Sequence, residues 1–433
     1  MGFVLVLNLA FWIRFDVFVP LVSWPLAGAA AITLLTMYVA NVYSADIDES
    51  VRRIALRTIT AIMVSGLVIA GMTYVVGVVR LRAEPLFWRS VLPFGLMGFA
   101  LWAVSWRYVV FGVLRQRDQK RRWLLVGEGA RAQRIVSDFT SSSIEGQLQS
   151  AACANVATDV LSKNDGKGIN GVNGWSGVVL AAEHTLNDSQ VAELMQARMR
   201  GLRVYDFVGF YEKYWRKIPI GELQDDWFLY SSGFRLVHHA LALNAKRLLD
   251  ILLSMAILII GAPVMLLAVM LIKLDSKGPI FYTQLRTGQR GKTIRMYKFR
   301  TMVEDAEQQG AAWAEVNDTR VTRVGRWLRA WHLDELPQAW NVLKGDMSCI
   351  GPRPERPEFT QELEKNIPYY DLRYLVKPGI TGWAQVMHPY GSSVDDARKK
   401  LEYDLYYIKN YSLLLDAFIA LKTLRVMVFG GGR

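Results

Sequence analysis

The sequence predicts a membrane α-helical bundle followed by α/β domains. Hydrophobic residues make up 52% of the 433 residues, and the mean hydropathy of +0.16 is high for a soluble protein of this size. Several apolar runs approach the roughly 20 residues that a helix needs to cross a bilayer. After residue 122, strand-like segments such as 123–126 and 294–299 alternate with helical stretches, as they do in α/β domains.

Residues 1–115 predict four transmembrane helices. Arginines gather between the second and third apolar segments and again after the fourth, which places both of these loops on the cytoplasmic side. We therefore expect four crossings with both ends inside and a short outer loop around 80–84. Arg14 and Asp16 interrupt the first segment; the four segments lie near 3–22, 26–43, 58–79 and 90–113.

Residues 116–240 predict a small, degenerate Rossmann-like module. After the strand-like segment 123–126, residues 127–132 fit the dinucleotide motif G-x-G-x-x-A loosely. No strand ending in Asp or Glu follows about 20 residues later, where a ribose partner belongs; instead, 141–176 is rich in Ser, Gly and Asn. Two further strands flank a helix at 188–199. We expect a role in assembly or regulation, and nucleotide binding is left open.

The apolar run 246–274 predicts a re-entrant membrane helix. Basic residues flank both of its ends, so the charges give no inside–outside asymmetry. Pro263 near its middle removes a backbone hydrogen bond and bends the helix axis. Both features fit a helix that enters and leaves the membrane on the cytoplasmic face, with a break at Pro263. A plain spanning helix is the alternative.

Two adjacent carboxylates, Asp334 and Glu335, form the candidate catalytic site. They precede Pro337, whose fixed φ suits the first turn of a short helix, and the positive end of that helix favours an anion or a bound phosphate. Upstream, Lys298 and Arg300 are expected on one face of a strand, where together they can hold a diphosphate. The alternatives are a solvated ion pair at a helix start and a basic face over the membrane.

Four motifs are KFRTM at 298–302, RWLRAWHLDELPQAW at 326–340, NVLKGDMSCIGPRP at 341–354 and PGITGWAQV at 378–386. Together they closely resemble the bacterial sugar transferase family, the polyprenyl-phosphate sugar-1-phosphate transferases. The match covers roughly residues 246–433. In that family a Ser-Pro pair usually marks the break of the re-entrant helix, whereas this chain has Ala262-Pro263.

The resemblance implies an α/β catalytic domain at 275–433. Its expected reaction moves a sugar-1-phosphate from a nucleotide diphosphate sugar, expected to be a UDP-sugar, to the polyprenyl carrier undecaprenyl phosphate. Asp334 is then the nucleophile and a ligand of Mg²⁺, and Glu335 orients or activates the site. The expected substrate-binding residues are Lys298, Arg300, Arg329 and Arg353.

The resemblance also implies a multi-pass protein of the bacterial inner membrane. Its catalytic domain faces the cytoplasm and initiates exopolysaccharide or other glycoconjugate assembly. The identity of the sugar and of the polymer, and the existence of a homodimer, are left open by the sequence.

The net charge of +12 suits membrane lipid and anionic substrates. Nucleic acid is not expected, because no basic stripe interleaved with aromatic residues occurs. Cys153 and Cys349 predict buried free thiols rather than a disulfide.

Two alternative functions remain. A non-catalytic scaffold or regulator of polysaccharide assembly is disfavoured by the intact Asp334-Glu335 pair, and a nicotinamide-dependent enzyme by the missing ribose carboxylate.

Overall fold

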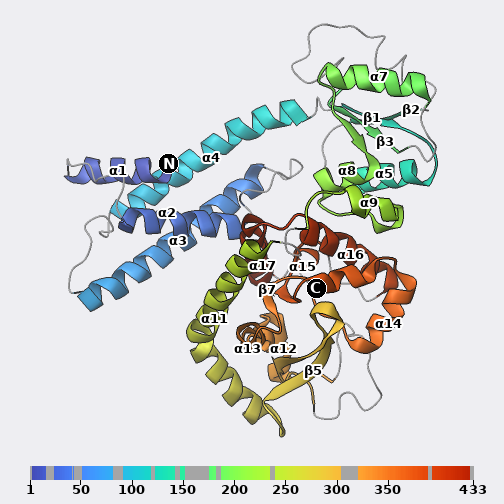
Figure 1. Ribbon diagram of the computed structural model, residues 1–433. Helices are drawn as coiled ribbons and strands as arrows, with labels where there is room; N and C mark the ends of the chain where they lie inside the picture. Colours follow the sequence, from blue (N-terminus) through green and yellow to red (C-terminus); the bar gives the residue numbers. More distant parts are fainter. Residues whose placement is uncertain are drawn as a thin grey trace. The chain divides into compact units, whose positions relative to one another are not determined.

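The computed structural model divides into two units, Met1–Phe210 and Tyr211–Arg433 (Figure 1). Its described residues are 2–15, 24–40, 42, 51–80, 91–118, 122–141, 147–151, 175–181, 187–234, 239–303, 320–388 and 393–429.

The described residues before position 119 include four apolar helices, which overlap the segments that the sequence predicts but differ from them in their bounds. They share an apolar core in which Leu7, Leu26, Ile62 and Phe99 are buried. The described part of α3 contains a span long and apolar enough to cross a membrane, Ala55–Tyr74. Four crossings stay a prediction, and the expected outer loop lies beyond the described end of α3. The helices are α1 (Gly2–Phe15), α2 (Trp24–Val39), α3 (Val51–Arg80) and α4 (Val91–Asp118).

A four-stranded parallel sheet follows, with the strand order β2-β1-β3-β4. The sequence predicted β1, β3, β4 and the helix α7, whereas β2 falls in the stretch rich in Ser, Gly and Asn, where no strand was expected. Parallel strands in this order are typical of a doubly wound α/β sheet; kinship with dinucleotide-binding folds stays a prediction. The elements are β1 (Arg122–Val126), α5 (Ala130–Ser141), β2 (Gln147–Ala151), β3 (Gly177–Leu180), α7 (Asp188–Met199), β4 (Val204–Asp206) and α8 (Phe207–Phe210).

The second unit begins at Tyr211, and the predicted bounds of the module, 116–240, stay a prediction. Residues 211–234 pack on helix α16 (Val394–Lys409) and the turn after it: Glu212 accepts a hydrogen bond from Lys409 at 2.7 Å, and Gly233 lies against the Lys409 carbonyl. These contacts span almost 200 residues, so the local sequence carries no sign of them. The short elements are η4 (Tyr211–Trp215), η5 (Ile220–Glu222) and α9 (Asp225–Tyr230).

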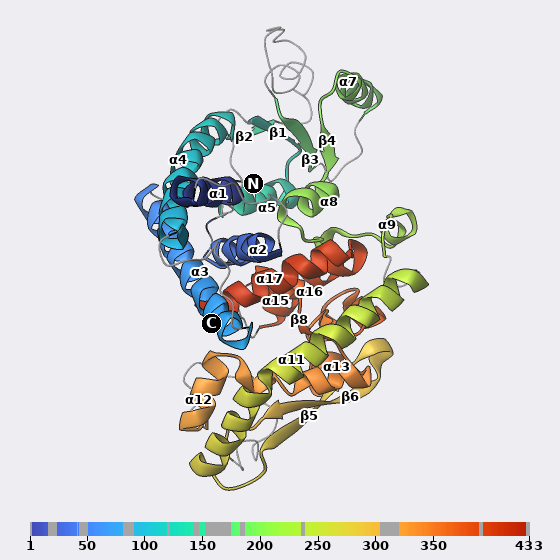
Figure 2. The same cartoon turned by 90° about the vertical axis from the view of Figure 1, so that its left-hand side faces the viewer.

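Helix α11 (Ala240–Asp275) is 36 residues long and has the length and hydropathy of a membrane helix. The structure corrects the expected break at Pro263, because the helix continues through the proline. A proline removes one hydrogen bond while the neighbouring turns keep theirs, so the axis bends without interruption. Figure 1 shows α11 as a bowed arc, and Figure 2 shows it crossing in front of α13, which it contacts.

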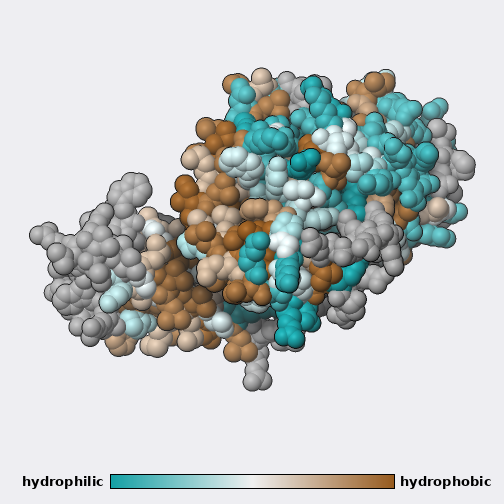
Figure 3. Space-filling model, turned by 90° about the horizontal axis from the view of Figure 1, so that it is seen from below, coloured by the Kyte–Doolittle hydropathy of each residue, from teal (hydrophilic) through white to brown (hydrophobic). Residues whose placement is uncertain are grey.

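One side of α11 exposes long apolar side chains, including Ile260 at 78% and Leu274 at 81% exposure. Figure 3 shows hydrophobic residues gathered over the side of the second unit that carries this helix. Both ends of α11 nevertheless bind the same folded unit. Arg247 donates hydrogen bonds to the carbonyls of Val342 (2.5 Å) and Leu343 (2.7 Å), and at the other end Asp275 accepts one from a backbone N–H of α12 at 3.1 Å.

The remaining elements form the α/β part of the second unit. An antiparallel hairpin of β5 and β6 packs on α13, where Asn341 donates to the Arg295 carbonyl at 2.7 Å and accepts from Tyr297 N at 3.1 Å. The elements are β5 (Phe281–Thr287), η6 (Gln289–Gly291), β6 (Thr293–Phe299), α12 (Arg323–Ala330), η7 (Leu333–Glu335), α13 (Gln338–Lys344), β7 (Ser348–Ile350), α14 (Pro357–Asn366), η8 (Tyr370–Leu375), β8 (Gly379–Thr381), α15 (Trp383–Met387), α16 and α17 (Leu413–Phe429).

Candidate active site

Asp334 and Glu335 lie on the short 3₁₀ helix η7, between α12 and α13. His332 turns the chain between α12 and η7 in the left-handed conformation, with a φ of 53°. Pro337 is the N-cap of α13, so that helix begins one residue after the predicted position. The two carboxylates therefore precede the positive end of α13, where negative charge is favoured.

Glu335 is held between two cations. Lys298 on β6 donates to Glu335 Oε1 at 2.8 Å, and Arg353 donates to both oxygens, to Oε1 at 2.5 Å and to Oε2 at 3.2 Å. Burial alone would raise the pKa of Glu335, but the charges of Arg353 and Lys298 outweigh burial and hold this pKa well below its usual value. Glu335 is therefore ionised, fixed in orientation, and already engaged at both oxygens.

Asp334 has the same charge but no such partners. It is 8% exposed, and in the described part of the chain no hydrogen bond or ion pair reaches its carboxylate. Burial raises the pKa of Asp334 and the neighbouring Glu335 charge raises it further, whereas Lys298 and two arginines oppose this rise. A desolvated, unpaired carboxylate among cations has oxygens that are free to attack phosphorus or to bind a metal.

Arg329, in the last turn of α12, is one of the two arginines that lower the pKa of Asp334; the other is Arg353. Its Nε donates to Thr301 Oγ1 at 2.9 Å, which fixes the direction of the guanidinium. The structure thus brings together Lys298, Arg329 and Arg353, three of the four expected substrate-binding residues, around the carboxylate pair.

The structure places Arg300 apart from this group. Its guanidinium donates to the carbonyls of Ser276 and Lys277, both at 2.8 Å, directly after the end of α11. In a strand, alternate side chains lie on the same face, which would place Arg300 beside Lys298. Strand β6 ends at Phe299, so this alternation does not extend to Arg300. The guanidinium instead fixes the connection between α11 and the hairpin.

Two close-packed glycines fix the loop that carries Arg353. A Cβ on Gly379 would collide with the backbone of Gly351, so the residue after β7 can approach the start of β8 this closely only where position 379 is glycine. Arg373 donates to the Arg353 carbonyl at 2.9 Å and to Asp404 at 3.0 Å. The glycine-rich motif at 378–382 therefore serves to position Arg353.

Sequence reasoning missed the residues that support the site, namely Thr301, Asn341 and Arg373. All three are buried polar side chains that bond to segments distant in the chain. The sequence offered a signal for one of them: Asn341 is a polar residue within the apolar stretch 339–343. A buried amide must find hydrogen-bond partners, so this residue could have been expected to hold a neighbouring segment.

Asp334 is the carboxylate of the pair with oxygens available to a metal ion. Among the residues that the structure describes, no cluster of three or more His, Cys, Asp and Glu side chains converges. A single free carboxylate fits Mg²⁺, because this ion is often bound through one or two carboxylates, with substrate phosphates and water completing its shell.

Comparison with known proteins matches residues 241–430 to a family described as bacterial sugar transferase. A putative undecaprenyl-phosphate N-acetylgalactosaminyl 1-phosphate transferase of Bacillus subtilis (strain 168) is 49% identical over 131 residues, which are 30% of this chain and 73% of that relative. The chain belongs to the bacterial sugar transferase family. The family region contains the whole carboxylate site and all of α11 except its first residue.

Two further relatives of this chain differ in the share of their length that is matched. An exopolysaccharide production protein PSS of Rhizobium leguminosarum bv. phaseoli is 40% identical over 184 residues, covering 41% of the chain and 92% of the relative. A UDP-N-acetylgalactosamine-undecaprenyl-phosphate N-acetylgalactosaminephosphotransferase of Aeromonas hydrophila is 50% identical over 187 residues, covering 43% of the chain. The matched region spans only 44% of the Aeromonas relative's length.

Proposed function

We propose that this protein transfers a sugar-1-phosphate from a UDP-sugar to undecaprenyl phosphate and thereby initiates exopolysaccharide or other glycoconjugate assembly. The observation that carries the proposal is the unpaired, buried Asp334 carboxylate beside a fixed Glu335 and three cations. The name of the Aeromonas relative supports the same substrate classes.

The proposed reaction has two steps. An Asp334 oxygen attacks the sugar-linked phosphorus, the bond from that phosphorus to the bridging oxygen breaks, and uridine monophosphate leaves with the bonding electrons. An oxygen of the lipid phosphate then attacks the same phosphorus, the aspartyl–phosphorus bond breaks, and the carboxylate is regenerated. The products are uridine monophosphate and a polyprenyl diphosphate sugar.

The chain's own residues contribute a preorganised positive field. Lys298 and Arg353 are locked in place by Glu335, and Arg329 by Thr301, so they need not reorganise when charge shifts between phosphates. Asp334 is the residue that would hold a Mg²⁺ ion, and a bound Mg²⁺ would supply further neutralisation of phosphate charge. The proposed role of Glu335 is to orient these cations.

We also propose that α11 is re-entrant and that the catalytic unit faces the cytoplasm of a bacterial inner membrane. The hydrogen bonds from both ends of α11 to one folded unit support this arrangement, because a spanning helix would end on opposite sides of the bilayer. Single cysteines at Asn244 and Lys277, in a chain without native cysteines, should both react with a reagent applied from the cytoplasmic side. Labelling of either one from the periplasm would exclude the re-entrant topology.

The test of function uses the full chain in lipid with a panel of UDP-sugars. With donor alone, mass spectrometry should find a phosphosugar adduct on the peptide containing Asp334; with undecaprenyl phosphate added, uridine monophosphate release should become catalytic. Asp334→Asn should abolish both, and Asp371→Asn, at an exposed position, is the matched control. A scaffold without catalysis would give neither adduct nor turnover with any donor.

A further inference from the structure

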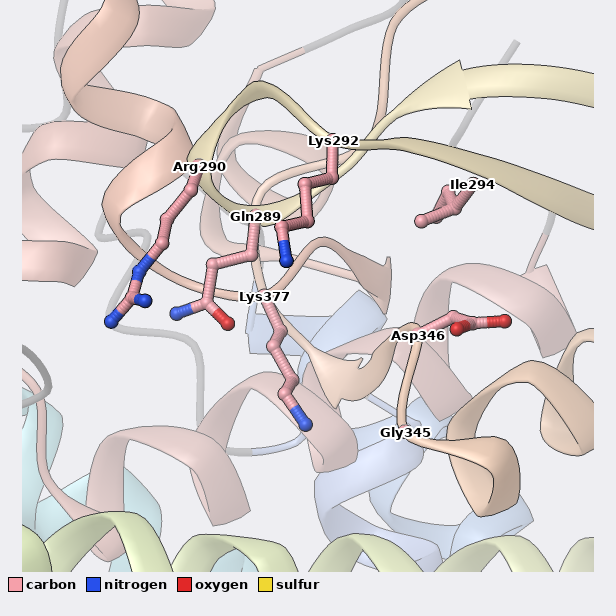
Figure 4. A pocket seen from close by; sticks show the side chains of 7 residues that line it. All are labelled: Gln289, Arg290, Lys292, Ile294, Gly345, Asp346 and Lys377. Carbon is pink, nitrogen blue, oxygen red and sulfur yellow. The ribbon is translucent and has the colours of Figure 1, made fainter.

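A basic cavity, separate from the carboxylate site, lies at the opposite end of α13 from Asp334. It has a volume of about 310 Å³ and lies between the hairpin turn, the residues after α13 and the approach to β8 (Figure 4). None of its residues belongs to the carboxylate site. The lining residues are Gln289, Arg290, Lys292, Ile294, Gly345, Asp346 and Lys377.

The charges around this cavity are unbalanced. Arg290, Lys292 and Lys377 contribute cations, and in the described part of the chain none of these side chains has a hydrogen bond or an ion pair. The lining acid, Asp346, is paired with Lys344 at 3.2 Å. Burial and the nearby Arg247 charge lower the pKa of Lys377, as expected where like charges meet without an anion between them.

A glycine and a hydrogen bond shape the lining of the cavity. Gly345 has a φ of 95°, and a Cβ there would lie 3.5 Å from Arg247 Nη2 and 3.7 Å from Lys377 Nζ, in the space between the two cations. Gln289 Nε2 donates to the Leu375 carbonyl at 3.0 Å and ties the hairpin turn to the opposite wall.

Arg290 occupies a position that suits glycine better than arginine. Its φ of 56° is left-handed, a conformation that strains any residue with a Cβ. Figure 4 shows its side chain extending from the turn beside Gln289, with Lys292 on the same turn. An arginine at a strained backbone position beside two lysines points to a use for its charge.

We propose that this cavity is a second anion site, which binds a phosphate-bearing ligand apart from the phosphates that react at Asp334. Arginine can grip two phosphate oxygens, and the two lysines add point charges from other directions. The volume is at the lower end of small-molecule sites, so it suits a phosphate or diphosphate group with a small substituent. Two sources share this chemistry: a soluble phosphate compound and a lipid headgroup, because Arg247 directly precedes the exposed Leu248 and Leu249 of α11.

The test follows the reactivity of Lys377 in the full chain, reconstituted in phosphatidylcholine nanodiscs. An amine-acylating reagent is applied with and without inorganic diphosphate, and modification of the Lys377 peptide is measured by mass spectrometry. Bound diphosphate should slow this modification at least fivefold. Arg290→Gly and Lys292→Gln should each abolish the protection, and Lys365→Gln, which removes one exposed charge elsewhere, should preserve it.

Arg290→Gly also separates binding from folding. It removes the charge and relieves the backbone strain, so its thermal unfolding midpoint should equal or exceed that of the unmodified protein while protection is lost. Protection should persist in Asp334→Asn, which distinguishes this site from the proposed catalytic one. Nanodiscs containing phosphatidylglycerol identify the source: protection without added diphosphate indicates a lipid headgroup. Absence of protection with both probes, or equal protection in Arg290→Gly, would overturn the proposal.

Discussion

Replacing Glu335 with glutamine tests how the two carboxylates divide their roles. In Glu335→Gln, Lys298 and Arg353 lose the anion that they share, at 2.8 and 2.5 Å. Breaking a buried ion pair by removing one partner costs about 3–5 kcal/mol. The Arg353 side chain is 37% exposed and can be rehydrated, so we expect a loss in the free energy of unfolding of about 2–3 kcal/mol.

The same substitution should change the pH dependence of turnover. The Glu335 charge raises the pKa of Asp334, and the two cations that Glu335 now engages would act on Asp334 more strongly once released. In the proposed mechanism only the ionised Asp334 attacks phosphorus, so activity should fall as the pH drops through the pKa of Asp334. The acid limb of the profile should therefore shift to lower pH in Glu335→Gln, while turnover falls by about 10²-fold because the cations are misplaced.

The assay is release of uridine monophosphate from pH 4.5 to 8, with the unfolding midpoint measured on the same preparations. Glu335→Asp is the matched control, because it keeps the charge and shortens the reach to the cations. An acid limb of Glu335→Gln that stays in place or moves to higher pH would refute the assigned coupling between the carboxylates.

The remaining predictions concern three other charges. Asp334 has a raised pKa in the folded state, so its contribution to stability is present at low pH and is lost as the pH rises through that pKa. At pH 7, Asp334→Asn should therefore be inactive yet about 1 kcal/mol more stable in denaturant unfolding; lower stability would contradict the raised pKa. Arg300→Lys should lose about 1–2 kcal/mol because it cannot reproduce the forked contacts to Ser276 and Lys277. The KM for the UDP-sugar should stay unchanged, and a raised KM at constant stability would move Arg300 into the substrate site. Asp416→Asn leaves Lys246, its partner at 2.8 Å, buried without a countercharge and should cost about 3–5 kcal/mol in thermal unfolding. Adding Lys246→Met should recover part of that loss, and no recovery would contradict the ion-pair explanation.

The sequence predicted elements whose signal is local. Apolar runs located the first four helices and α11, and Pro337 located the start of α13 to within one residue. It did not predict β2, because a strand in a polar stretch forms by pairing with β1, which local composition does not record.

At the candidate site, the pairing of Lys298 and Arg353 with Glu335 could not be derived from the sequence. Lys298 and Arg353 are 37 and 18 positions from Glu335, and only the folded structure determines which cation meets which oxygen. Arg300 shows the limit of periodicity, because the alternation of a strand ends where the strand ends. A proline in the middle of a helix likewise predicts a bend but does not determine whether the hydrogen-bonded turns continue past it.

The two hydrogen bonds from Arg247 to α13 link the movement of α11 to the position of Asp334. The C-terminal end of this two-turn helix is hydrogen-bonded to α11, the proposed membrane helix. Its N-terminal end follows Pro337 and the turn that holds Asp334. Stretching, thinning or curving the surrounding leaflet tilts a helix that lies in it. Such a tilt would be transmitted along α13 and would change the height of the Asp334 carboxylate, so the proposed first step of the reaction would become sensitive to the state of the surrounding lipid.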